Sequence, residues 1–178
     1  KEEEARGLQS LAEYRILGTK PELCYDDITK IAATTCNVPI SLMTLVDKDK
    51  QWFKSKIGLQ ISETRRDWSF CTHAIKENSP LIIHDAFQDE RFINNPLVKG
   101  DPKIRFYAGF PLRNSDGNKL GTLCVIDRKP GNLTTQQFNI MELLSKQIVS
   151  FLELRKKSLN LLDALSNLHK QEGNLSVC

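Results

Sequence analysis

No stretch of this 178-residue sequence is apolar over the roughly 20 residues that a membrane-spanning helix needs. The N-terminus begins Lys-Glu-Glu-Glu, which is too acidic for a signal peptide. Lysines and arginines outnumber the acidic residues by only three, and they form no block of the kind that binds nucleic acid. We therefore expect a cytoplasmic chain with no membrane segment and no nucleic-acid partner.

The cysteines form no pattern of a disulfide framework or a metal site. The count of five is odd, and no CxxC pair occurs, so we expect a reducing compartment rather than a disulfide framework. The P-loop, GxSxG and HExxH motifs are also missing. The sequence therefore predicts neither a catalytic residue nor a metal site, and it identifies no cofactor. The cysteines are Cys24, Cys36, Cys71, Cys124 and Cys178.

A long hairpin is the clearest feature that the sequence does contain, over Ile104–Asp127. Two apolar runs flank a polar tip at residues 114–118, where Asp-Gly is a turn signal. Gly109 and Gly121 lie within the runs, and a strand glycine leaves room for another backbone or a ligand, or marks a bulge. Pro111 cannot donate to a ladder, so we expect an irregular hairpin there.

Two helices are predicted before the first strand. Apolar spacing indicates one over residues 8–17, ended by Gly18, and the acidic residues before it read as a disordered tail. Thr19 and Glu22 match a capping box, which predicts a second helix to about Cys36. Its inward-facing residues would be Ile28, Ile31, Ala32 and Cys36.

Short elements are predicted in the middle of the chain. Residues 40–46 read as a strand buried on both faces, and residues 51–57 as the returning strand, with Trp52 and Phe53 on opposite faces. Asp67 or Ser69 caps a short helix. Residues 81–83 form a strand, and Asp89 caps another short helix through Phe92.

The last predicted element is a very long helix. Thr134 and Gln137 match a second capping box, and a helix to about Lys170 would be on the order of 50 Å long at ~1.5 Å per residue. A domain of this size is only roughly 35 Å across, so the helix must overhang it. The overhang either folds back on its own domain or pairs with a second copy, and we favour a parallel dimer. The core stripe would be Phe138, Met141, Leu144, Ile148 and Phe151, followed by Leu159, Leu162 and Leu165 with Leu161 and Leu168 beside them.

Three motifs in register resemble the bacterial GAF domain. They are Asp67–Ile75, Arg105–Leu112 and Leu120–Asp127, with Tyr14–Leu17, Gln51–Ser55 and Leu152–Arg155 as further matches. The resemblance runs from about residue 8 to residue 157. Three departures stand out: Gly18 where Asp is usual, Thr72 where Ala is usual, and Phe110 where a small residue is usual. The Asn-Lys-x-Asp-Phe-Asp-Glu stretch of cyclic-nucleotide-binding relatives is missing, which disfavours that ligand class.

The resemblance implies an α+β fold with a GAF-like central antiparallel sheet. Helices would cover one face, with the first and last helices packed together. Loops around residues 58–79 and 86–103 would roof the other face over a small-molecule pocket. The implied organisation is an N-terminal tail and helix (1–18), a GAF sensor domain (19–154) and a C-terminal signalling helix extension (155–178). Similar domains precede histidine kinase, diguanylate cyclase or phosphatase modules.

Candidate site residues come from the motifs. Cys71 and His73 suggest a metal site, an activated thiolate or an attachment point, but a buried thiol and a hydrogen-bonded imidazole explain them more simply. The aromatic residues line a pocket or pack the core, and we favour the core. Arg65, Arg66 and Arg105 either bind an anion or are solvated. The pocket candidates are Trp52, Trp68, Phe70, Cys71, His73, Arg105, Phe106, Tyr107 and Cys124.

Three functions compete on this sequence. The first is a non-enzymatic sensor that binds a small molecule and relays its state through a dimeric C-terminal helix. The second is a ligand-free dimerisation module, which Phe110 favours if its ring fills the pocket. The third is a small thiol-dependent redox enzyme, because some GAF-fold proteins reduce free methionine sulfoxide. The cysteines here do not match those enzymes, so this function ranks last.

Overall fold

A six-stranded antiparallel sheet forms the centre of the computed structural model, which describes residues 2–175. The strand order is β3-β2-β1-β6-β5-β4, which places the predicted β5–β6 hairpin inside the sheet. Cys178 and the end of the predicted 155–178 extension lie outside the described residues. The strands are β1 (Ile40–Val46), β2 (Lys50–Ile57), β3 (Glu63–Arg65), β4 (Leu81–Ile83), β5 (Phe106–Arg113) and β6 (Lys119–Asp127).

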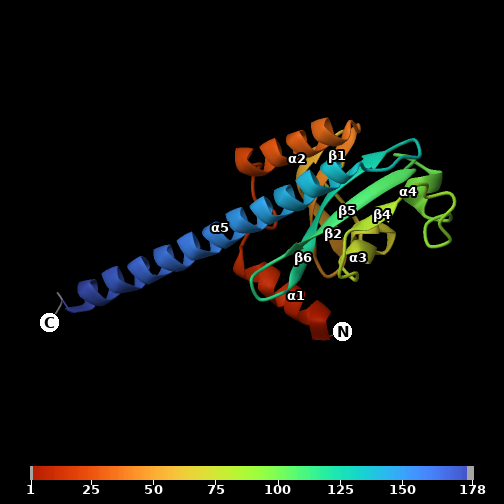
Figure 1. The fold of residues 1–178 in the computed structure, drawn as a ribbon. Coiled ribbons are helices and arrows are strands. Elements are labelled where there is room, and N and C mark those ends of the chain that lie inside the picture. The colour runs from red at the N-terminus through yellow and green to blue at the C-terminus, as the bar shows by residue number, and fades with distance from the viewer. Residues whose placement is uncertain (1, 176–178) are drawn as a thin grey trace.

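Helices and loops cover opposite faces of this sheet, which confirms the predicted α+β architecture. Helices α2 and α5 lie side by side on one face, and α3, α4 and the loops lie on the other (Figure 1). The helices are α1 (Glu2–Glu13), α2 (Leu23–Cys36), the 3-10 turn η1 (Arg66–Trp68), α3 (Phe70–Ala74), α4 (Pro96–Lys99) and α5 (Thr135–Leu175).

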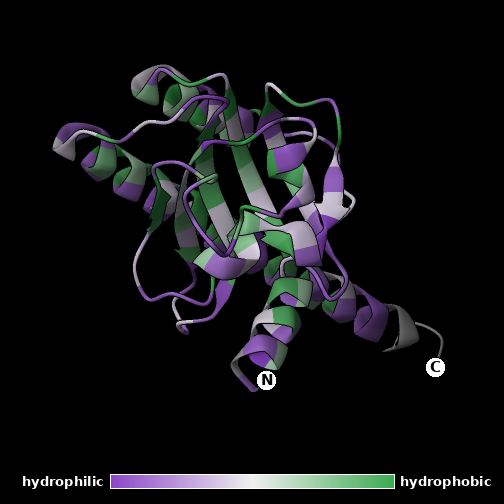
Figure 2. Ribbon diagram, turned by 90° about the vertical axis from the view of Figure 1, so that its right-hand side faces the viewer, coloured by the Kyte–Doolittle hydropathy of each residue, from purple (hydrophilic) through white to green (hydrophobic). Residues whose placement is uncertain are grey.

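Each face of the sheet has its own apolar core. Because successive strand residues point to opposite faces, Phe106 and Phe110 of β5 face the helices, while Tyr107 between them faces the loops. Hydrophobic residues are concentrated along the strands between the two layers (Figure 2). Phe110 packs edge-on against Phe138 of α5, with ring centroids 5.1 Å apart. The ring of Phe110 therefore does not fill the pocket, contrary to the possibility that the sequence left open.

The β5–β6 hairpin closes as the sequence predicts. Asn114 organises the tip, because its side-chain oxygen accepts hydrogen bonds from the backbone N–H groups of Asp116 and Asn118. Gly117 takes a φ of 81°, which suits glycine. The irregularity expected at Pro111 lies instead between Leu112 and Arg113, and Pro111 pairs in register with Thr122.

Both hairpin glycines allow a close approach. A Cβ atom at Gly121 would overlap the carbonyl oxygen of Thr44 in the neighbouring strand β1. A Cβ atom at Gly109 would overlap the ring and hydroxyl of Tyr107, which lie across it. The first predicted alternative, room for another backbone, is therefore confirmed at Gly121.

The predicted N-terminal boundaries were wrong. Helix α1 begins at Glu2, inside the expected disordered tail, where acidic residues in the first turn favour a helix N-terminus. It ends at Glu13 instead of near Leu17, because Arg15 adopts a left-handed backbone with a φ of 47°. The predicted Thr19–Glu22 capping box does not form, since Glu22 occupies the N-cap position without a side-chain cap.

Three smaller expectations also failed. The helix that pairs with α5 is α2, whereas α1 packs against β6. Ile31 of α2 is 48% exposed, so it does not face inward. Asp89 begins a hydrogen-bonded turn rather than a helix, with the N–H of Phe92 bonded to the Asp89 carbonyl. Ser69, by contrast, caps α3 as one of the two predicted candidates.

Helix α5 confirms the predicted overhang. Thr134 and Gln137 form the reciprocal capping box, each side chain accepting from the backbone N–H of the other. The 41 residues of α5 span about 60 Å at ~1.5 Å per residue, and the helix extends far beyond the sheet (Figure 1). In the first half of α5, the side that faces the core is formed by the buried residues Met141, Ile148 and Leu152. Across residues 2–175, no helix is long and apolar enough to cross a bilayer.

We expect Gly121→Ala to lower the free energy of unfolding by about 3 kcal/mol or more, because the strand carbonyl of Thr44 cannot move aside without breaking the sheet. Urea denaturation followed by circular dichroism measures this loss. The matched control is Gly131→Ala, because the three atoms nearest to its new methyl all belong to the Phe106 side chain and lie 3.4 Å or more away. A loss in Gly121→Ala as small as in the control would contradict the close approach.

Candidate functional site

A small cavity lies between the sheet and the loops that roof its second face. Its volume is about 30 Å³, and both predicted roof segments contribute to it, with Leu59 and Ile61 from the first and Leu97 and Pro102 from the second. Most of the wall is apolar. The complete lining is Leu42, Gln51, Phe53, Leu59, Ile61, Thr64, Phe70, Cys71, Leu97, Pro102, Ile104, Tyr107 and Ile126.

Cys71 brings a polar group to the wall of this cavity. Ser69 fixes the start of α3, where its hydroxyl accepts from the Thr72 N–H at 3.1 Å and also bonds the buried amide of Gln51. Cys71 follows in the first turn of this helix. The Tyr107 hydroxyl, which crosses the strand over Gly109, donates to the Cys71 sulfur at 3.1 Å.

Burial and hydrogen bonding shift the pKa values of Cys71 and Cys124 in opposite directions. Burial raises the pKa of the Cys71 thiol, but hydrogen bonds from Cys124, Thr122, Thr44 and Tyr107 oppose it and lower the pKa to about 6. Burial and the neighbouring Cys71 raise the pKa of Cys124 well above its usual range. Cys71 therefore accepts from the Tyr107 hydroxyl, and burial favours the protonated form of Cys124.

His73 does not join Cys71. Its ring lies edge-on against Phe92, with centroids 4.9 Å apart, and burial lowers the pKa of the imidazole. His84 contacts the carbonyl of Gly131 through Nδ1. Among residues 2–175, no group of three or more His, Cys, Asp or Glu side chains could hold a metal ion.

Four of the nine pocket candidates meet at this site, namely Phe70, Cys71, Tyr107 and Cys124. Trp52 and Phe106 lie on the opposite, helix-covered face of the sheet. Trp68 is 37% exposed on the surface. The sequence analysis missed Thr44 and Thr122, whose hydroxyls lie 3.0 Å apart beneath Cys71, although the strand alternation that links Thr122 to Cys124 was a signal for one of them.

The three arginines that could have bound an anion have separate partners. Arg105 donates to the carbonyls of Val98 and Ile104, both at 2.9 Å, and its guanidinium lies 3.5 Å from the Phe87 ring centroid. It therefore holds the roof loop in place. Arg65 pairs with Asp67 and Arg66 with Glu4, at 2.8 Å and 2.6 Å.

A second candidate site is an exposed row of leucines on α5. Successive residues of a helix are rotated by about 100°, so these leucines point within roughly 40° of one direction. They lie on the side of α5 opposite the buried Met141, Ile148 and Leu152. Each is between 46% and 65% exposed. This row differs from the predicted one, because Leu159 is half-buried on the core side and Leu162 points to the flank. The leucine stripe consists of Leu143, Leu154, Leu161, Leu165 and Leu168.

Comparisons with known proteins agree with this architecture. The chain is 37% identical over 148 residues to a cyclic di-GMP phosphodiesterase of Pseudomonas aeruginosa, covering 83% of this chain but only 25% of that protein. The structure resembles the GAF domain of an Acinetobacter phosphoenolpyruvate-protein phosphotransferase, with a TM-score of 0.61 and 15% identity over 88% of this chain and 96% of the other.

An enzyme with the same fold is equally similar in structure to this chain. Free methionine-R-sulfoxide reductase from Neisseria meningitidis matches with a TM-score of 0.62 and 14% identity, over 82% of this chain and 87% of that enzyme. Identities this low show a shared fold and carry no function. The sequence pattern described as the GAF domain matches residues 20–151, most of the chain. This chain therefore belongs to the GAF domain family.

Proposed function

We propose that this GAF domain is a non-enzymatic regulatory module of a signalling protein, which forms a homodimer through α5 and relays its state along that helix. The observation that carries the proposal is the leucine stripe. An isolated helix with an uncovered apolar row is marginal in water, and burying a leucine is worth about 1.5–3 kcal/mol. A partner surface would therefore stabilise the overhang.

The spacing favours a second copy as that partner. Leu154, Ser158, Leu161, Leu165 and Leu168 follow one another at steps of four, three, four and three residues. This is the repeat of a two-stranded coiled coil, in which each leucine packs between residues of the facing helix. Parallel pairing would bring the two C-terminal ends of α5 together.

The Pseudomonas relative indicates where the output would lie. This chain spans about a quarter of that phosphodiesterase, so the relative contains a large part that the chain does not match. We infer a similar arrangement here, with any catalytic output in a separate module and the GAF domain as its regulator. A thiol-dependent activity of this domain is less well supported, because Cys71 is 2% exposed and Cys124 is fully buried.

A second candidate function is binding of a small molecule under the roof. Enclosure of an apolar cavity between the sheet and both roof segments favours it. The volume opposes it in this conformation, since about 30 Å³ is the space of one liquid water. A ligand would have to displace roof side chains such as Leu59 and Leu97.

We expect Leu161→Glu to weaken dimerisation at least about 100-fold, because it would bury two unpaired carboxylates in the seam. The matched control is Leu162→Glu, because Leu161 and Leu162 are both 62% exposed but only Leu161 belongs to the stripe. Sedimentation equilibrium of both variants and the wild type gives the dissociation constants. A monomeric wild type, or equal weakening by both changes, would argue against the seam.

Native mass spectrometry of the purified wild type tests the pocket. We expect a dimer whose mass equals two bare chains, because the roofed cavity is too small for an organic ligand. Repeating the spectrum under denaturing conditions separates bound from covalently attached mass. A recurrent extra mass on each subunit would instead support the small-molecule sensor.

A further inference from the structure

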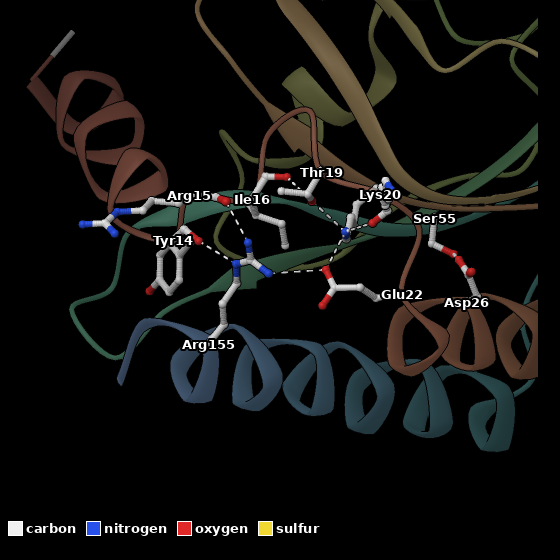
Figure 3. Close-up of polar contacts among 10 residues, drawn as sticks. Tyr14, Arg15, Ile16, Thr19, Lys20, Glu22, Asp26, Ser55 and Arg155 are labelled. Atoms are coloured by element: carbon white, nitrogen blue, oxygen red, sulfur yellow. Dashed lines mark hydrogen bonds and ion pairs between the residues drawn. The ribbon is translucent and has the colours of Figure 1, made fainter. Parts of the chain in front are cut away.

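The α1–α2 linker, residues 14–22, is held by charged side chains that are distant in the sequence. It contains neither helix nor strand, so its carbonyl groups need partners from elsewhere. Arg155 of α5 supplies two of them (Figure 3): its Nε donates to the Tyr14 carbonyl at 2.7 Å and its Nη2 to the Arg15 carbonyl at 2.8 Å. One guanidinium thus joins the linker to the point where α5 leaves the domain.

Lys54 of β2 holds the other end of the linker. Its side chain is fully buried, and its ammonium donates to the Lys20 carbonyl at 2.6 Å and the Thr19 hydroxyl at 2.8 Å. Glu22 completes the site, with its carboxylate 2.6 Å from Lys54. The same carboxylate lies 3.4 Å from Arg155 (Figure 3). A buried ammonium is costly unless it is paired, so Lys54 fixes the linker to the sheet.

Arg15 extends the contact along α5. Its left-handed backbone costs on the order of 1 kcal/mol, and such strain persists where the surroundings require it. In this conformation Arg15 presents its carbonyl to Arg155 and its guanidinium to Asp163, 2.7 Å away. Asp163 lies two turns beyond Arg155, on the side of α5 opposite Leu161, so this ion pair leaves the leucine stripe uncovered.

Helix α1 is connected to the same network through the hairpin tip. Asn114 donates to the Ser10 hydroxyl at 2.7 Å and to the Tyr14 hydroxyl at 3.2 Å. The Tyr14 hydroxyl in turn donates to Glu153 of α5 at 2.6 Å. A continuous set of hydrogen bonds therefore runs from α1 to α5 on the side of the sheet away from the roofed cavity.

We propose that the α1–α2 linker couples α1 to α5, so that a displacement of α1 changes how firmly α5 is held at its exit from the domain. This inference rests on the proposed function only in taking α5 as the output. It adds a route for regulation that bypasses the cavity. Arg155 acts as the positioning residue, because its guanidinium is shared by the linker carbonyls and Glu22.

A double-mutant cycle measures the coupling. Leu11→Ala loosens α1, since Leu11 is buried beneath it. Arg155→Met removes the guanidinium, and Arg155→Lys keeps the charge but not the two carbonyl bonds. Hydrogen exchange of the α5 amides at residues 153–163 is compared with that of β1, which reports global unfolding. We expect Leu11→Ala to speed this exchange about tenfold in the otherwise wild-type chain, about threefold in the Arg155→Lys background and less than twofold in the Arg155→Met background.

The control is Lys157→Met, two residues along the same helix and exposed, which should preserve the tenfold effect. An equal effect of Leu11→Ala in the wild-type and Arg155→Met backgrounds, or none in the wild type, would overturn the proposal. If Arg155→Met fails to fold, the Arg155→Lys series decides by the same comparison. Sedimentation of the same samples reports dimerisation separately, so a monomer would defeat the proposed function while the exchange ratio still decides the coupling.

Discussion

Burial of the central strands on both faces is the constraint from which the rest of the fold follows. Strands β1, β5 and β6 carry apolar side chains on both faces of the sheet, so neither face can be exposed to water. Helices α2 and α5 cover one face, and the roof segments cover the other. The glycines of the hairpin belong to the same constraint, because Gly121 allows β1 to approach closely while both faces stay packed.

Local signals made much of this predictable. The Asp-Gly turn, the Thr134–Gln137 capping box and the 3.6-residue spacing of α5 depend on neighbours in the sequence, and the structure confirms each of them. The α1–α2 linker could not be predicted in this way. Glu22 faces Lys54 and Arg155 rather than capping α2, and Arg155 stands 141 residues from the Tyr14 carbonyl that it binds. Patterns among neighbouring residues cannot indicate partners that are so far apart in the sequence.

The candidate site was half predictable for a related reason. Strand alternation shows which residues share a face, as Phe106 and Phe110 do, but not whether helices or loops cover that face. The family motifs correctly indicated Cys71 and Tyr107. The same motifs also indicated Trp52 and Phe106, which pack in the core on the helix-covered face. Thr44 belongs to the site because β1 pairs with β6 in the register that places Thr44 opposite Thr122.

The position of Arg155 gives α5 a mechanical property. Arg155 stands twenty residues from each end of the helix, so about 30 Å of rod lies on either side of it. One arm rests on the sheet and α2, and the other extends beyond the domain once past the contact of Asp163 with Arg15. A helix pivoting at its midpoint is a lever with equal arms, so a tilt of the packed half is delivered to the far tip at full size and in the opposite direction.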